Sequence, residues 1–417
     1  MRVLFSILGL AFVLAACGGG GGGSVTPPGN GGGGTPTPSS SPGGTPTPHS
    51  SSSPGSTPTP HNTPTPPPTP TPPPTPTPNG NPTPYPSPPY IIQDTNTSTA
   101  NVYVGELCGS SVPYSQCAEQ YAGLYYHSLS MENMFSNWQT DMGNFLKGNQ
   151  VYTWGVPNRS SNIVPMVTWE PFNVNYTDVI SGHWDSYITI TAQELAAFKF
   201  PIFLRPFHEF NGSWDSWSLS HQGANTQADL NFIAAWQHMV TIMRPIAPNV
   251  RFVWCYANDS VPKQPWNEPA AAYPGDAYVD WIAFDAFNRG SLGGLPWIPF
   301  SSLIADSYKK GVAINANKPI MLAEIATNEW SNTDNGARKA AWITDMFSQI
   351  ETNFTNIRAL NYFDASSSAP PHPYTYALTS SPAVANAWIY GIRPIDKNGV
   401  LLFRGNGEPE AQVTTAH

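Results

Sequence analysis

Two glutamates follow short apolar segments in the second half of the chain, where their carboxyl groups could act together. Glu209 comes five residues after the segment 202–204, and Glu324 directly follows the segment 319–323. Hydrolysis of a glycosidic bond needs two carboxyl groups beside that bond, and a separation of about 5 Å makes one of them a nucleophile. The two glutamates therefore indicate this chemistry, provided that the fold brings their side chains face to face.

The segments that would position these glutamates alternate between strands and helices. We expect strands at 202–204, 251–256, 279–284, 319–323 and 357–363, and helices at 185–199, 228–243, 300–310 and 337–350. Such alternation implies a parallel sheet covered by helices. Because each strand ends in polar or aromatic residues, the pattern favours an α/β fold of the (β/α)8 TIM-barrel type, with its active site at the C-terminal strand ends.

The strand count places the two carboxyl groups on opposite strands of that barrel. If 357–363 is the eighth strand, Glu209 belongs to the fourth and Glu324 to the seventh. Earlier strands are expected at 102–106 and 163–169, and the segment 121–130 is a candidate for a further one. No Gly-x-Gly-x-x-Gly motif follows any predicted strand, which argues against an open dinucleotide-binding sheet.

Composition narrows the class of ligand. The chain has 417 residues, and 25 of its 46 prolines and 16 of its 35 glycines precede residue 90. It carries 18 basic and 27 acidic residues without a basic run, which argues against nucleic acid or an anionic membrane surface as a partner. The 14 tryptophans and 18 tyrosines suit a neutral, hydroxylated ligand.

The N-terminal part indicates export and a tether. Residues 1–17 carry a short apolar run that ends in small residues before Cys17, which resembles a bacterial lipoprotein signal. We expect a lipid on Cys17, an extracytoplasmic location and membrane contact through that anchor alone. Residues 18–90 read as a disordered Gly/Pro/Thr/Ser-rich tether, 91–392 as the catalytic domain and 393–417 as a tail of unknown role.

The cysteines predict a disulfide and no metal site. Cys108 and Cys117 flank a short loop and can pair in an oxidising compartment, whereas Cys255 lies in an apolar run and is expected to be buried. The pair His208-Glu209 lacks the second histidine of a zinc-protease helix, because position 212 is glycine. We expect a monomer with neither cofactor nor metal.

Three motifs resemble those of family-26 glycoside hydrolases. They are RPFHEFNGSW at 205–214, YPGDAYVDWIAFD at 273–285 and KPIMLAE at 318–324. The resemblance covers roughly residues 101–391 and implies a retaining endo-β-glycanase with a polysaccharide substrate. The family is dominated by endo-β-1,4-mannanases and also contains mixed-linkage β-glucanases and β-1,3-xylanases.

The resemblance also implies roles for individual residues. Glu209 would be the general acid/base and Glu324 the nucleophile, whose negative charge would raise the pKa of Glu209. Arg205 would hold carboxylates below the site. The residues implied to contact or position the substrate are Arg205, His208, Asn211, Trp214, Trp217, Asp285, Phe287 and Tyr362.

The chain departs from the mannanase pattern at several positions, which leaves alternatives open. Asp215 and a serine interrupt the aromatic run after Trp214, Phe287 replaces a tyrosine, and Tyr362 replaces a tryptophan. The sequence WEP at 169–171 resembles the mixed-linkage branch. We expect a mannan endo-1,4-β-mannosidase. The alternatives are a mixed-linkage β-1,3-1,4-glucanase, a β-1,3-xylanase and, in another class, a non-catalytic carbohydrate-binding lipoprotein.

Overall fold

The computed structural model describes residues 102–107, 131–148, 164–198, 201–290, 294–368, 373–392 and 403–404. The predicted lipidation site Cys17, the tether 18–90 and the Cys108–Cys117 pair lie outside these residues. Within them, no helix is long and apolar enough to cross a membrane.

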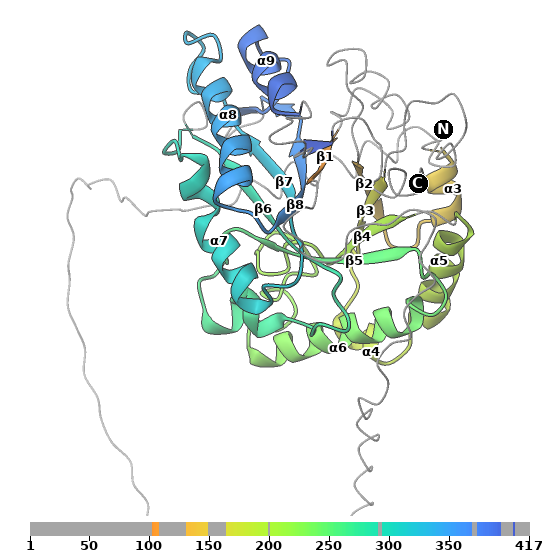
Figure 1. The fold of residues 1–417 in the computed structure, drawn as a ribbon. Helices are drawn as coiled ribbons and strands as arrows, with labels where there is room; N and C mark the ends of the chain where they lie inside the picture. Colours follow the sequence, from red (N-terminus) through yellow and green to blue (C-terminus); the bar gives the residue numbers. More distant parts are fainter. Residues whose placement is uncertain are drawn as a thin grey trace, which may run out of the picture. The chain divides into compact units, whose positions relative to one another are not determined.

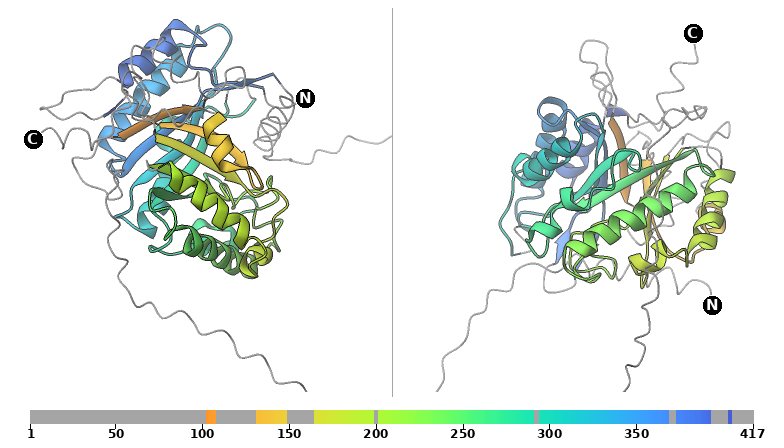
Figure 2. Two further views of the ribbon diagram at one scale, coloured as in Figure 1. Left: turned by 90° about the vertical axis from the view of Figure 1, so that its right-hand side faces the viewer. Right: turned by 90° about the horizontal axis from the view of Figure 1, so that it is seen from below.

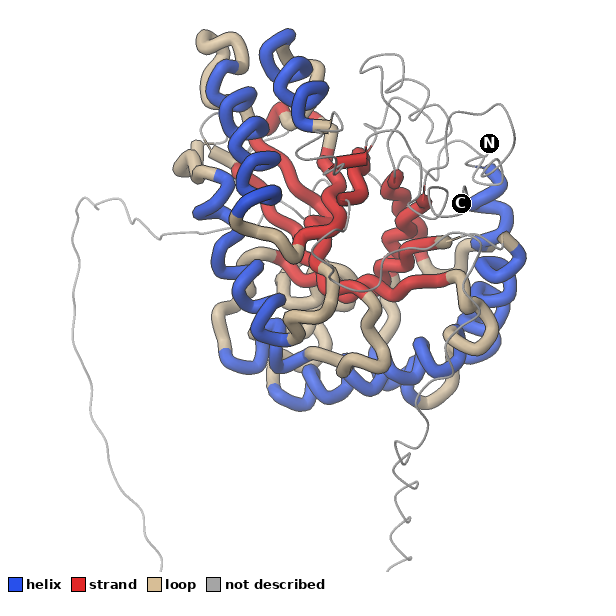
Figure 3. Tube along the Cα trace, in the orientation of Figure 1, coloured by secondary structure: helices blue, strands red, loops and turns tan. Residues whose placement is uncertain are grey.

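Eight parallel strands form the centre of the fold (Figure 3). They are β1 (Val102–Leu107), β2 (Met131–Asn137), β3 (Val164–Glu170), β4 (Ile202–Pro206), β5 (Val250–Ala257), β6 (Trp281–Asn288), β7 (Ile320–Thr327) and β8 (Ile357–Phe363). Each strand pairs with its neighbour along the chain, and β1 pairs with β8, which closes the sheet. The predicted (β/α)8 barrel is therefore confirmed. A short strand, β11 (Phe403–Arg404), adds a parallel pairing to β1.

Helices surround the barrel and bury its outer face (Figure 1). They are α3 (Met142–Gly148), α4 (Tyr176–Ile180), α5 (Asp185–Ala197), α6 (Thr226–Met243), α7 (Phe300–Ile314), α8 (Ala337–Thr352) and α9 (Pro382–Gly391). Figure 2 shows α8 and α9 side by side, on the part of the barrel formed by the later strands. Local sequence sets the start of α6, because the Asn225 side chain accepts a hydrogen bond from the Ala228 N–H at 3.1 Å.

The early strand that the sequence pattern did not reveal is β2. Its sequence, MENMFSN, alternates apolar residues with Glu132, Asn133 and Ser136. Strands buried on both faces usually read as continuous apolar runs, so β2 resembles a loop in sequence. Asn133 is nevertheless fully buried and accepts a hydrogen bond from Thr168. The suggested alternative, 121–130, lies outside the described residues.

A β-bulge interrupts the pairing of β6 with β7. Phe284 is opposite Leu322, whereas the next residue of β6, Asp285, is opposite Glu324. Ala323 is therefore an extra residue on β7. Because side chains of a regular strand alternate between faces, this extra residue moves Glu324 to the face that Asp285 occupies. The bulge thus brings the two carboxyl groups together.

Candidate active site

The turn after β4 presents Glu209. Phe207 and Glu209 both have a φ angle of 51°, in the left-handed region that non-glycine residues rarely adopt. The backbone N–H of Glu209 donates to the Cys255 carbonyl at 3.1 Å, and the Glu209 carbonyl accepts from the Gly212 N–H at 2.8 Å. These bonds hold the strained turn, so that Glu209 projects at the C-terminal end of the barrel, as its predicted place on the fourth strand requires.

Arg205 connects the acidic residues below the mouth of the barrel. Its Nη1 donates to both oxygens of Asp285, at 3.0 and 2.8 Å, and its Nη2 donates to Oε1 of Glu324. Its Nε donates to the Thr168 hydroxyl at 2.9 Å, and that hydroxyl donates to Asn133 at 2.7 Å. The guanidinium is completely buried, and two carboxylates offset the cost of burying its charge.

Arg205 also opposes the effect of burial on the pKa of Glu324, the predicted nucleophile. Burial raises the pKa of Glu324, and the charge and hydrogen bond of Arg205 act in the opposite direction. Asp285 and Glu324 together raise the pKa of Arg205, so this guanidinium stays charged. We infer that Arg205 keeps Glu324 ionised, which is the state that a nucleophilic carboxylate needs. Asp285 holds Arg205 in place, and its predicted role in substrate binding stays a prediction.

Glu209 has no guanidinium bonded to its carboxyl group among the described residues. Burial is the largest cause that raises its pKa to about 7, followed by the charge of Glu324. The indole N–H of Trp214 donates to Oε2 of Glu209 at 2.6 Å and works against this rise. The sequence interpretation attributed the raised pKa to Glu324, but burial contributes more. A carboxyl group with its pKa raised to about 7 therefore lies beside one that is bonded to a buried guanidinium.

Trp214 lies directly against the backbone of its own loop. A Cβ atom at Gly212 would come within 2.6 Å of the Trp214 ring, so only glycine permits this packing. The Trp214 side chain is half-buried. Its main visible contact is the hydrogen bond to Glu209, a role that the sequence interpretation did not assign to it.

Two further carboxyl groups near the pair were not predicted as site residues. Burial, then the charges of Glu209 and Glu324, raises the pKa of Asp215 to about 8. Glu170 ends β3, and burial together with Asp215 raises its pKa well above the usual value. Among the described residues, Oε1 of Glu170 has no hydrogen-bond partner. In the sequence, the signal for Glu170 was its position after an apolar segment. The signal for Asp215 was its position directly after the motif that contains Glu209.

His208 is a neutral partner in this group. Burial and the charge of Arg205 lower the pKa of its imidazole well below the usual value. One polar atom from each of His208, Glu209 and Asp215 lies within 4.8 Å of the other two. This spacing could hold a cation, a water molecule or a sugar hydroxyl. The positive charge of Arg205 disfavours the cation.

Two predicted substrate-binding residues instead stabilise the loop from inside. Trp217 is fully buried and donates its indole N–H to the His208 carbonyl at 2.7 Å. Asn211 is also fully buried. Its side chain donates to the Ala257 carbonyl at 2.9 Å and accepts from the Ala257 N–H at 2.7 Å. The predicted substrate contacts of Trp217 and Asn211 are wrong, because neither side chain reaches the surface in this structure.

The aromatic residues of β6 and β8 also differ from expectation. Tyr362 is fully buried and packs against Trp388 of α9, with ring centroids 5.3 Å apart, so it does not form the floor of a sugar site. Phe287 is half-buried and stacks against Tyr376 with centroids 5.6 Å apart. Of the predicted aromatic contacts, Trp214 and Phe287 remain accessible to a ligand.

Cys255 is buried, as predicted, and belongs to the same polar group. Its thiol donates to Oδ1 of Asp285 at 3.4 Å and lies 3.7 Å from Nη1 of Arg205. It therefore contributes to the floor beneath the two glutamates as well as to packing.

Known sequences and structures resemble this chain in the region of the barrel. Endoglucanase H of Acetivibrio thermocellus is 31% identical over 274 residues, which are 65% of this chain and 29% of that protein. The mannan endo-1,4-beta-mannosidase of Bifidobacterium adolescentis is 30% identical over 88 residues, 21% of this chain and 8% of that protein. Beta-1,3-xylanase TXYA of a Vibrio species is 25% identical over 207 residues, 46% and 42% of the two chains. The chain spans less than half the length of each relative.

Solved structures share the fold at low sequence identity. The catalytic domain of a Bacillus sp. JAMB-750 GH26 endo-beta-1,4-mannanase has a TM-score of 0.53 at 14% identity, and the alignment covers 77% of this chain and 91% of that one. GH26C from a Muricauda species has a TM-score of 0.52 at 18% identity, with 75% and 90% covered. The sequence profile of Glycosyl hydrolase family 26 matches residues 134–365, more than half of the chain. The chain therefore belongs to glycosyl hydrolase family 26.

Proposed function

We propose that this protein is a retaining endo-β-glycanase that cleaves β-1,4 bonds in a β-glucan of the mixed-linkage type. The observation that carries the reaction is the contrast between its two glutamates. Glu324 is bonded to a buried, charged guanidinium, whereas the pKa of Glu209 is raised to about 7. A nucleophile and a proton donor are thus held in one site.

The reaction would proceed by double displacement. The Glu324 carboxylate attacks the anomeric carbon, the bond to the leaving oxygen breaks, and the proton of Glu209 moves to that oxygen. The charge of Glu324 is lost in the resulting ester, so the pKa of Glu209 falls and its carboxylate can accept a proton from water. That water attacks the anomeric carbon, the ester bond breaks, and both glutamates return to their starting states.

The choice of β-glucan rests on the extent of similarity. Endoglucanase H matches 65% of this chain, whereas the mannosidase matches 21%. The sequence WEP at 169–171 also favours the mixed-linkage branch of the family. For these two reasons we propose mixed-linkage glucan ahead of mannan, which the sequence interpretation had ranked first.

Mannan is the second candidate substrate. It is supported by the 30% identity to mannan endo-1,4-beta-mannosidase over 88 residues. The similarity to a beta-1,3-xylanase, 25% over 207 residues, makes β-1,3-xylan a third polymer to test.

A substrate panel tests these proposals. The protein would be incubated with lichenan, barley β-glucan, carboxymethylcellulose, galactomannan, glucomannan and β-1,3-xylan, and reducing ends would be measured. We expect the highest rate on lichenan or barley β-glucan, with the β-anomer appearing first in proton NMR. If mannan is the only polymer cleaved, mannan replaces mixed-linkage glucan as the proposed substrate. If the α-anomer appears first, the enzyme does not retain the anomeric configuration. Binding without turnover would favour a non-catalytic carbohydrate-binding protein.

The location of the protein is a separate proposal that rests on sequence. We propose that Cys17 is lipidated, and that the tether 18–90 holds a monomeric catalytic domain outside the cytoplasm. Labelling with a radioactive fatty acid, compared between the wild type and Cys17→Ala, tests the anchor. Light scattering of the anchor-free protein tests the monomer.

A further inference from the structure

Arg289 places a positive charge at the mouth of the barrel. It follows Asn288, the last residue of β6, and its guanidinium lies 5.6 Å from the centre of the Phe287 ring. The residue is half-buried. No ion pair and no side-chain hydrogen bond of Arg289 is present among the described residues. Its five N–H donors are therefore available to a ligand.

This situation contrasts with the arginines that serve the fold. Arg205 binds Asp285 and Glu324, and Arg244 pairs with Asp280 at 3.0 Å. Arg289 has no such carboxylate partner among the described residues. Contact with the face of an aromatic ring orients the planar group without using its hydrogen-bond donors.

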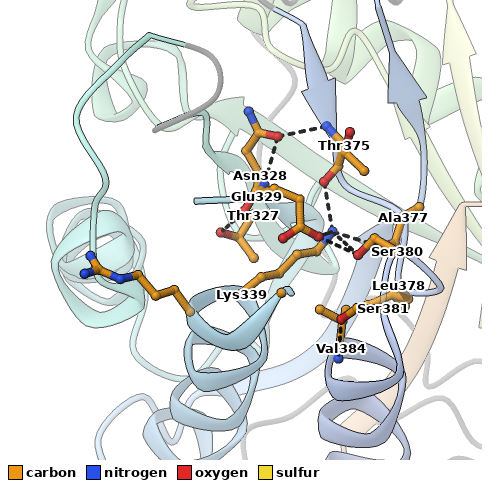
Figure 4. A network of polar contacts seen from close by, with 12 residues as sticks. Thr327, Asn328, Glu329, Lys339, Thr375, Ala377, Leu378, Ser380, Ser381 and Val384 are labelled. Carbon is orange, nitrogen blue, oxygen red and sulfur yellow. Dashed lines mark hydrogen bonds and ion pairs between the residues drawn. The ribbon is translucent and has the colours of Figure 1, made fainter. Parts of the chain in front are cut away.

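The backbone carbonyl of Arg289 accepts a hydrogen bond from Asn328, which belongs to a network that also includes Thr375 and Lys339 (Figure 4). Asn328 is fully buried, and its Nδ2 donates to the carbonyls of Arg289 and Pro373, both at 3.4 Å. Its Oδ1 accepts from the Thr375 N–H at 2.8 Å. Lys339, also fully buried, donates to the Thr375 carbonyl at 2.8 Å. Arg289 is thus presented by a rigid support.

The guanidinium is also close enough to the acid/base to affect its titration. Arg289 lowers the pKa of Glu209, in the same direction as Arg205. The other groups that face Glu209 are Glu324 and Asp285 from β7 and β6, and His208 and Asp215 from its own loop. Arg289 therefore lies near Glu209 at the C-terminal end of the barrel.

We propose that Arg289 is a substrate-binding residue whose guanidinium binds two neighbouring hydroxyl oxygens of the sugar unit at the cleaved bond. This assignment rests on the proposed function. The fork of N–H groups matches a pair of adjacent oxygens, and lysine cannot reproduce that geometry. Phe287, which was predicted to contact substrate, orients this arginine through its ring.

Two substitutions separate the binding role from the electrostatic one. Arg289→Gln removes the charge and the fork, whereas Arg289→Lys keeps the charge and loses the fork. Arg338→Gln is the matched control, because Arg338 also lies over an aromatic ring, that of Trp330 at 3.8 Å, but is exposed on α8. KM and kcat on lichenan or the best substrate of the panel, and the pH profile of kcat/KM, would be measured.

We expect both Arg289 variants to raise KM about tenfold, since each loses charge-assisted hydrogen bonds of the fork. Only Arg289→Gln should move the basic limb of kcat/KM to higher pH, because removing a positive charge raises the pKa of Glu209. Arg338→Gln should match the wild type in both measurements.

The proposal is overturned if Arg289→Gln has the KM and the pH profile of Arg338→Gln. Affinity electrophoresis in gels containing each polysaccharide provides a test that does not depend on turnover. If the wild type cleaves nothing but is retarded, the proposed function fails, and loss of retardation in Arg289→Gln alone still supports the binding role. If the wild type is neither active nor retarded with any polymer, both proposals fail.

Discussion

The indole N–H of Trp214 donates to Oε2 of Glu209 over 2.6 Å, within the same turn of the chain. This bond occupies one carboxyl oxygen, so the proton of Glu209 resides on the other, Oε1. The strained φ angle of Glu209 and the close packing of Trp214 on Gly212 hold the two side chains in this relation. The orientation of the acid is therefore set before any substrate binds.

Replacing Trp214 by phenylalanine should alter the titration of Glu209. The indole hydrogen bond lowers the pKa of Glu209, so its loss should raise that pKa above about 7. We expect the basic limb of kcat/KM to move to higher pH in Trp214→Phe, with kcat reduced about tenfold because the acid is less well oriented. Trp217→Phe is the control, since its indole bonds to a backbone carbonyl. An unchanged limb in Trp214→Phe would contradict this role.

The two glutamates should be separable by chemical rescue. We expect Glu209→Gln and Glu324→Gln each to lose activity by at least about a hundredfold while keeping the wild-type circular dichroism spectrum. In Glu324→Ala, azide should restore cleavage of an activated aryl glycoside and give the α-glycosyl azide. In Glu209→Ala, azide should give the β-glycosyl azide. The reverse assignment of product anomers would exchange the two roles.

The buried acids should make the fold more stable at mildly acidic pH. The pKa of Asp215 is raised from 3.8 to about 8 and that of Glu209 from 4.5 to about 7. At pH values between the usual and the raised pKa of each group, the folded state binds more protons than the unfolded state. The free energy of unfolding therefore falls as pH rises through this range. We expect Tm to decrease from pH 5 to pH 8 and the slope to be shallower in Asp215→Asn. A Tm that rises over this interval would contradict the prediction.

The buried Lys339 should contribute strongly to stability. It donates to the carbonyls of Thr375 and Ala377, both at 2.8 Å, and lies 3.4 Å from Oε1 of Glu329. Lys339→Met would leave Glu329 and the carbonyls without their cation, at a cost of about 3–5 kcal/mol. Urea denaturation measures this loss. The double variant Lys339→Met/Glu329→Gln should recover part of it. A loss below about 1 kcal/mol in Lys339→Met would contradict this prediction.

Much of the barrel could be predicted from sequence because its later strands are apolar runs. The five strands from β4 onward and the helices between them lie where the pattern placed them, with bounds that differ by a few residues. The strand β2 could not be found this way, since the buried Asn133 serves the hydrogen-bond chain that ends at Arg205. A polar residue that is buried because it forms hydrogen bonds across the barrel interrupts the apolar pattern by which strands are predicted.

The site was predictable in its chemistry and less so in its contacts. The motifs identified Glu209, Glu324 and Arg205, because their residue types are what the reaction needs. They could not show that Trp217 and Asn211 point inward. The motif indicates which strand or loop carries a residue. The direction of its side chain depends on packing against elements that are distant in sequence.

The β-bulge on β7 decides which face of the strand carries the side chain of Glu324. On a regular strand, Glu324 would share a face with Leu322, which pairs with Phe284. The bulge at Ala323 shifts the alternation of faces by one residue, so the carboxylate of Glu324 faces inward only because Ala323 is accommodated out of register. A strand that kept Ala323 but lost the bulge would turn Glu324 toward the helices while leaving every residue of the motif present. For an engineer who borrows this barrel, the bulge is therefore as important as the glutamate itself.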